Sequence, residues 1–211
     1  MNRINYDELL FRITQDLDHR PALLLHSCCA PCSSYCLIRM LPHFDITCFY
    51  YNPNITDINE YEKRFAELER LAGMLNEEYD PVKNGYAPIA VMRGDYEPEL
   101  FMETVKAREL QECPEGGKRC EMCFDMRLRR TYEVAAQKGF EYFTTTLTIS
   151  PLKDAQLINS IGFYIAEDAS GVKWLPSDFK KRDGFKQSIE LSRKYGLYRQ
   201  NYCGCVFSRS R

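Results

Sequence analysis

The segment ALLLHSCCAPC, residues 22–32, joins a short apolar run to three cysteines within five residues. A short apolar run that ends in a loop is consistent with a strand buried in a sheet. We therefore expect a strand at residues 22–26, then a cysteine loop, then a helix at residues 33–41. Phosphate-binding folds have a glycine-rich loop at this position, so thiols in its place indicate a different chemistry.

Strands and helices are expected to alternate along the rest of the chain. Apolar and β-branched runs predict further strands at residues 45–51, 89–92, 140–147 and 172–175. Amphipathic segments predict helices at residues 58–75, 98–108, 118–137 and 184–195. A further helix should open at Ser150-Pro151, with Ser as cap and Pro at the first position. This alternation predicts an α/β fold, a parallel sheet with helices on both faces, in which ligands lie outside the carboxyl ends of the strands.

The composition fits a single domain with a full-sized core, since 45% of the 211 residues are hydrophobic and 27% are charged. The chain has no run of about 18 or more apolar residues, and its start is not a secretory signal. We therefore expect a cytoplasmic protein without a membrane segment. Its ten cysteines then favour metal binding or redox catalysis over disulfides, because cytosolic thiols stay mostly reduced.

Charge is spread unevenly along the chain. Residues 1–105 carry 9 Lys/Arg and 17 Asp/Glu, a balance of −8, whereas residues 106–211 carry 19 and 13, a balance of +6. A basic half is compatible with a polyanionic partner such as a nucleic acid. Solvated helix faces would explain the same pattern equally well.

A second cysteine group, CEMC at residues 120–123, opens an expected helix, where cysteines three apart face the same way and can share a metal. The three histidines have no ligand spacing, so this thiol-rich set favours an iron–sulfur cluster over zinc. Adjacent Cys28 and Cys29 should point in different directions, so a centre there needs ligands from elsewhere in the chain. Either group could instead be buried core thiols, as we expect for Cys36 and Cys48.

The third group is Cys203-Gly204-Cys205, near the C-terminus. One glycine between two cysteines permits a small, strained disulfide ring, and strained disulfides tend to be labile or catalytic. The same pair could instead hold a metal, or be two unpaired thiols of the tail.

The cysteine groups belong to an ordered set of motifs that runs from about residue 20 to residue 208. The set comprises HSCCAPC (26–32), YNPNI (51–55), RCEMCF (119–124) with Arg127-Leu128, FTTTL (143–147) through Ser150-Pro151, DFK (178–180) and LYRQNYCGC (197–205). With this set in this order, the chain resembles the QueH-type epoxyqueuosine reductases. The resemblance divides the chain into an N-terminal extension, residues 1–19, and an iron–sulfur reductase domain, residues 20–211.

This resemblance implies the reduction of epoxyqueuosine to queuosine at the wobble position of tRNA, the last step of queuosine biosynthesis. It implies a Rossmann-like sheet of the adenine-nucleotide-hydrolase-like kind. It also implies a [4Fe-4S] cluster, an additional iron or other metal ion beside it, and no cobalamin. When the family's functional residues are carried over to the matching positions of this sequence, the resemblance implies four cluster ligands, Cys28, Cys29, Cys120 and Cys123. It implies that Cys203 and Cys205 form a redox-active pair.

Other roles follow from the chemistry that the resemblance implies. Cys32 is a candidate ligand of the second metal. An unidentified electron donor must supply electrons, because deoxygenation of an epoxide takes up two. The candidate contacts to tRNA phosphates, which position the nucleic acid without reading its sequence, are Arg127, Lys180, Lys181 and Arg182.

Two alternative functions stay open at this point. A zinc- or thiol-dependent tRNA-modifying enzyme on the same fold would need a Gly/Ser-rich nucleotide loop after the first strand, where this chain has cysteines. A non-enzymatic redox sensor or cluster carrier would need neither the basic half nor the Thr-rich strand end at residues 144–146.

Overall fold

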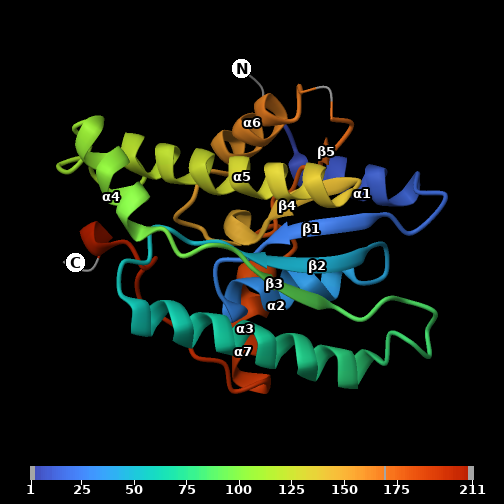
Figure 1. Cartoon of the computed structure of the whole chain (residues 1–211). Coiled ribbons are helices and arrows are strands. Elements are labelled where there is room, and N and C mark those ends of the chain that lie inside the picture. Colours follow the sequence, from blue (N-terminus) through green and yellow to red (C-terminus); the bar gives the residue numbers. More distant parts are fainter. Residues whose placement is uncertain (1–2, 169, 209–211) are drawn as a thin grey trace.

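The computed structural model describes residues 3–168 and 170–208 and contains a five-stranded, all-parallel sheet (Figure 1). The strands are β1 Ala22–His26, β2 Asp45–Tyr50, β3 Ala90–Arg93, β4 Tyr142–Thr145 and β5 Lys173–Trp174. The helices are α1 Tyr6–Gln15, α2 Ala30–Met40, α3 Ile58–Tyr79, α4 Pro98–Ala107, α5 Lys118–Lys138, α6 Ala155–Ile165 and α7 Gly184–Lys194. Within the described residues, none of the helices is long and apolar enough to cross a membrane.

Strand β1 lies at the centre of the sheet, whose order is β3-β2-β1-β4-β5. It pairs along one edge with β2, from Ala22 opposite Asp45 to His26 opposite Phe49, and along its other edge with β4. The chain therefore winds outward in one direction through β2 and β3 and in the other through β4 and β5. In open parallel sheets, ligands bind at such a switch point, outside the carboxyl ends of the two strands.

Helices cover both faces of the sheet, with α5 and α6 on one side and α2, α3 and α7 on the other (Figure 1). Successive residues of β1 supply both layers. Leu23 and Leu25 join the core under α2 and α3, whereas Leu24 joins the core under α5 and α6. Side chains of a strand alternate between faces, and strands of a parallel sheet are apolar on both because both are covered. The predicted α/β fold is confirmed.

Two predicted boundaries after β4 are wrong. The strand ends at Thr145, because the Thr145 Oγ1 accepts a hydrogen bond from Leu147 N (3.1 Å) and starts a 3-10 helix, Thr146–Ile149. The helix expected at Ser150-Pro151 begins only at Ala155. Its cap is Asp154, whose side chain accepts from Gln156 N at 2.8 Å. Residues 150–153 form a turn instead.

Helix α1 lies within residues 1–19, the segment expected to be an extension. Leu10 of α1 is buried in the core on the α2 side of the sheet. Asp7 forms ion pairs with Arg39 of α2 (2.6 Å) and with Arg182, ahead of α7 (2.8 Å). The helix is thus packed on the sheet domain, while the boundary at residue 20 stays a prediction.

The packing of α6 on β5 predicts a large stability effect from one added methyl group. A Cβ atom on Gly162 would lie 2.3 Å from the indole ring of Trp174, so Gly162→Ala should lower the free energy of unfolding by about 1–3 kcal/mol. Gly73 of α3 has no atom within 4 Å of such a Cβ. Gly73→Ala should therefore raise stability by about 0.5–1 kcal/mol, the helix preference of alanine. Urea unfolding of both variants checks this, and equal stabilities would contradict the α6–β5 packing.

Candidate metal centre

The loop between β1 and α2 brings three thiols together. The sulfur atoms of Cys28, Cys29 and Cys32 all lie within 4.8 Å of one another, with Cys28 and Cys29 Sγ 3.8 Å apart. The expectation that Cys28 and Cys29 point in different directions is wrong. Side chains alternate only along a continuous strand, and β1 ends at His26, with Cys29 already the N-cap of α2.

A buried hydrogen-bond network lies behind these thiols. His26 Nδ1 lies 2.8 Å from Thr145 Oγ1, and Arg127 Nε donates to His26 Nε2 at 3.2 Å. Arg127 also donates to the side chain of Asn52. Burial, and then the charge of Arg127, lower the pKa of His26 to about 3. His26 is therefore neutral, and both of its ring nitrogens have hydrogen-bond partners. It holds Arg127 and Thr145 in place behind the thiols and is not available as a metal ligand.

Thiols from three separate segments face one cavity of about 390 Å³. Besides the β1–α2 loop, they come from the start of α5 and from the C-terminal segment. The cysteines that line this cavity are Cys28, Cys32, Cys120, Cys123, Cys203 and Cys205. Cys29 joins them through the triad with Cys28 and Cys32. The predicted ligands thus share one site, although Cys120 and Cys123 stand outside the close triad.

The charges of the triad thiols are coupled. Hydrogen bonds from Cys29 and Cys32 lower the pKa of Cys28 well below its ordinary value, and the same bonds raise the pKa of Cys29 and Cys32. One negative charge is therefore stabilised by two neighbouring S–H groups. A soft metal can replace those protons, because thiolates are its preferred ligands. The donor set, rich in thiols and free of histidine, fits an iron–sulfur cluster.

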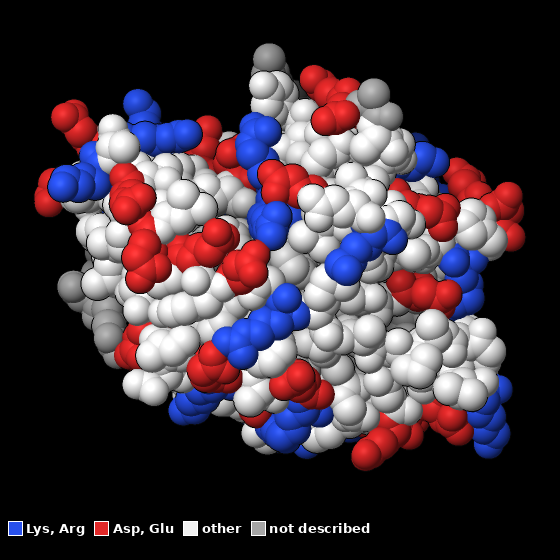
Figure 2. All heavy atoms as spheres, viewed as in Figure 1, with Lys and Arg blue, Asp and Glu red and all other residues white. Residues whose placement is uncertain are grey.

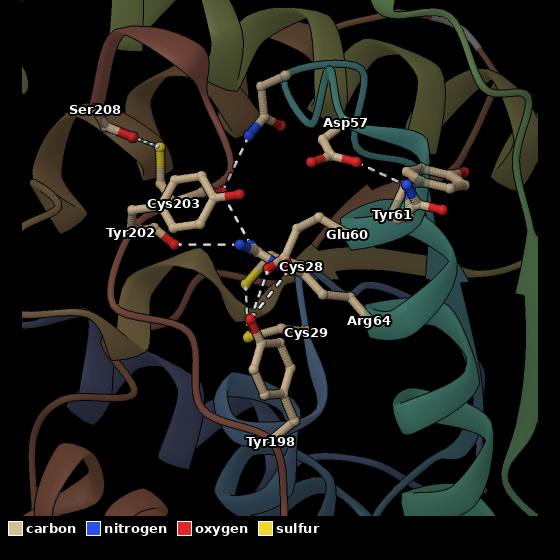
Figure 3. Close-up of polar contacts among 12 residues, drawn as sticks. Cys28, Cys29, Asp57, Glu60, Tyr61, Arg64, Tyr198, Tyr202, Cys203 and Ser208 are labelled. Atoms are coloured by element: carbon tan, nitrogen blue, oxygen red, sulfur yellow. Dashed lines mark hydrogen bonds and ion pairs between the residues drawn. The ribbon is translucent and has the colours of Figure 1, made fainter. Parts of the chain in front are cut away.

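The C-terminal cysteine pair is held by a buried arginine that sequence reasoning missed. Arg64 of α3 is 1% exposed and donates to the carbonyl oxygens of Cys203 (3.1 Å) and Tyr202 (3.3 Å). Glu60 fixes the guanidinium, with its Oε1 2.6 Å from Arg64 Nε. Figure 3 shows Arg64 between Glu60 and the segment of Tyr202 and Cys203. The sequence carries no signal that Arg64 holds the C-terminal segment, because an arginine on an amphipathic helix is expected at the surface.

Glycine is required between the two C-terminal cysteines. Gly204 has φ +101°, which L side chains rarely adopt, and its Cβ would lie 2.6 Å from Ile55 Cγ1. Asn54 adds a hydrogen bond from its Nδ2 to the Cys203 carbonyl, at 3.2 Å. The loop is therefore pressed closely onto the segment after β2. Cys203 and Cys205 are both free thiols here, as are the other eight cysteines, so the disulfide between them stays a prediction.

The cysteines expected in the core are there. Cys36 and Cys48 are both fully buried and belong to the core on the α2 side of the sheet. Burial raises the pKa of Cys48 to about 12. Neither residue lines the cysteine cavity, so the prediction that these two are core thiols is confirmed.

The basic residues proposed for tRNA have different surroundings. Arg127 is only 3% exposed, donates to His26 and lines the cysteine cavity, so it lies inside the molecule, and its contact with tRNA stays a prediction. Lys180 pairs with Asp178 (2.7 Å) and Arg182 with Asp7 (2.8 Å). Lys181 is exposed and, of the three, is the one without an ion pair among the described residues. Basic and acidic side chains are interspersed over the face shown in Figure 2. No continuous basic patch is visible on that face.

Comparison with known proteins agrees with this arrangement. The family model described as "Epoxyqueuosine reductase QueH" matches residues 23–211. The chain belongs to the QueH family. A protein of that name from Staphylococcus epidermidis is 43% identical over 98% of this chain and 85% of its own length. One from Streptococcus pyogenes serotype M1 is 39% identical over 98% and 78%. One from Thermotoga maritima is 39% identical over 88% and 89%. The family predicted from sequence, a family of oxidoreductases, is confirmed.

The geometry predicts that Cys203 is the reactive thiol of the C-terminal pair. A hydrogen bond from Cys205 lowers the pKa of Cys203, Ser208 Oγ at 3.1 Å lowers it further, and burial opposes both. The same contact raises the pKa of Cys205. In metal-free, reduced protein, the rate of Cys203 alkylation by iodoacetamide should rise with pH about a midpoint below ~8.5, the value of a free thiol.

Peptide mapping by mass spectrometry across a pH series measures these rates. Ser208→Ala should move the Cys203 midpoint to higher pH, because the thiolate loses a hydrogen-bond donor. Cys48 is an internal control that should stay unlabelled. A Cys203 midpoint at or above that of a free thiol would contradict the assignment.

Proposed function

We propose that this chain reduces epoxyqueuosine to queuosine at the wobble position of tRNA, using a [4Fe-4S] cluster. Its ligands would be Cys28, Cys29, Cys120 and Cys123. The observation that supports this most strongly is the meeting of thiols from the β1–α2 loop, α5 and the C-terminal segment at one cavity in a member of the QueH family. A nucleotide-activating enzyme on this fold would instead need a phosphate-binding glycine loop after β1.

The proposed reaction balances two electrons and two protons. The epoxide takes them up, both C–O bonds break, a C=C bond forms, and the oxygen leaves as water. A bound cluster would carry electrons one at a time from an external donor, and an additional iron or other metal held by Cys32 would act as a Lewis acid. The dithiol of Cys203 and Cys205 releases two electrons and two protons when it closes to a disulfide. This stoichiometry supports a redox role for the pair.

A tRNA substrate is supported by the chemistry of the cavity. Five cations line it, namely Arg64, Arg119, Arg127, Lys153 and Arg199, against two carboxylates, Glu115 and Asp154. The wobble base would reach the thiols only when it is unstacked and turned out of the anticodon loop. Lys180, Lys181 and Arg182 would hold phosphates outside the cavity. A tRNA substrate also agrees with the expected cytoplasmic location.

One assay tests the proposed reaction. Anaerobically prepared protein with dithionite and tRNA containing epoxyqueuosine should yield a nucleoside lighter by one oxygen atom, as measured by mass spectrometry. Cys120→Ala should lose iron, visible absorbance and turnover, because the cluster loses a ligand. Cys48→Ala is the control, since this thiol is buried in the core and should change none of the three. Full iron content in Cys120→Ala would remove Cys120 from the ligand set, and no product from the unsubstituted protein would reject the function.

Binding of tRNA can be tested apart from turnover. Lys181→Glu and Arg199→Glu should each weaken binding and reduce the slope of log K against log salt by about 1, as for the loss of one phosphate contact. Both residues are exposed. Lys138→Glu, at the exposed C-terminal end of α5, should leave the slope unchanged. Filter binding across a salt series measures the slope, and identical slopes for all variants would place the tRNA elsewhere.

A further inference from the structure

The turn between β4 and α6 directs one lysine into the cysteine cavity. Ser150 shapes this turn, because its Oγ accepts from Leu152 N (3.3 Å) and its carbonyl oxygen accepts from Lys153 N (3.2 Å). Leu152, although 77% exposed, and the next residue, Lys153, both line the cavity together with Cys28 and Cys203. The turn thus places Lys153 at the wall of the cysteine cavity.

Lys153 differs from the other cations of the cavity. Arg64, Arg119, Arg127 and Arg199 each donate hydrogen bonds to protein acceptors. No acceptor among the described residues takes a hydrogen bond from Lys153 Nζ. The adjacent carboxylate, Asp154, is engaged in capping α6. The ammonium group of Lys153 is therefore available to a ligand that enters the cavity.

The charges around Lys153 keep it protonated. Burial lowers the pKa of the Lys153 ammonium, but the nearby side chains of Cys28 and Cys32 raise it, and the net shift is upward. Arg127 opposes this shift, and Cys203 adds to it. A positive charge thus lies at the wall of the cavity that Cys28, Cys32 and Cys203 also line.

We propose that the Lys153 ammonium binds the epoxide oxygen of the substrate and stabilises the negative charge that grows on it as the C–O bonds break. This inference rests on the proposed function. The two electrons come from a low-potential reductant such as dithionite, and the oxygen leaves as water after taking up two protons. A fixed cation aimed at a developing oxyanion stabilises the transition state more than the ground state. An ammonium without a protein partner is suited to this, because it exchanges no existing hydrogen bond for the new one.

The test compares Lys153→Gln, Lys153→Arg and a control, Lys138→Gln, in the cluster-loaded enzyme. Lys153→Gln should lower kcat by about 10²–10³-fold, the usual effect of removing one oxyanion donor. Lys153→Arg keeps the charge and should recover part of that loss. Iron content, visible absorbance and thermal stability should match those of the unsubstituted enzyme, and Lys138→Gln should match it in every respect.

A binding measurement without reductant tests the contact itself. The unsubstituted enzyme should bind tRNA with epoxyqueuosine more tightly than the same tRNA with queuosine, which lacks the oxygen. Lys153→Gln should lose roughly tenfold of this preference, the size of one hydrogen bond to a charged group. A purely structural lysine would change both affinities alike.

Three results would overturn the inference. The first is a kcat of Lys153→Gln within twofold of the unsubstituted enzyme. The second is loss of iron from both Lys153 variants, which would make the ammonium a counter-charge of the cluster. The third is an unchanged preference for the epoxide. Absence of turnover in the unsubstituted enzyme would instead reject the proposed function, and the inference with it.

Discussion

The rest of the structure depends on the position of β1 between β2 and β4. Because all three strands are parallel, the segments that follow them emerge at the same edge of the sheet. The β1–α2 loop brings the thiol triad there, the segment after β2 brings Asn54, and the segment after β4 brings Lys153. Helix α5 and the C-terminal segment then close the cavity with two more cysteine pairs. One topological constraint therefore gathers groups that are far apart in the chain.

Burying several thiols around one cavity requires compensation, since burial of an unpaired polar or charged group is costly. The structure supplies this compensation through arginines whose guanidinium groups are held by hydrogen bonds and an ion pair. Arg127 is held by His26 and Asn52 beneath the triad, and Arg64 is held by Glu60 beside the C-terminal pair. These side chains place positive charge near sulfur without offering a competing ligand. These contacts fix the base of the site. Lys153, whose ammonium has no hydrogen-bond acceptor among the residues that the structure describes, lines the space where a substrate would lie.

Sequence reasoning found the elements whose signals are local. The apolar run of β1 and the cysteine groups are such signals, and the structure places them as a parallel sheet with a shared cavity. The prediction of the helix start after β4 failed. Ser150-Pro151 and Asp154 are both residues that favour a helix start, and only the tertiary fold selects Asp154. It also missed Arg64 and Lys153. A single arginine on a helix, or one lysine in a turn, forms no pattern in a sequence, and its role exists only through tertiary placement.

We propose above all that cysteines from the β1–α2 loop and from α5 hold one iron–sulfur cluster. Anomalous diffraction at the iron edge, from crystals of anaerobically purified protein, tests it most directly. We predict clustered iron in the cavity, ligated by Cys28, Cys29, Cys120 and Cys123. A lone zinc ion on Cys28, Cys29 and Cys32, or iron bound away from Cys120 and Cys123, would contradict it.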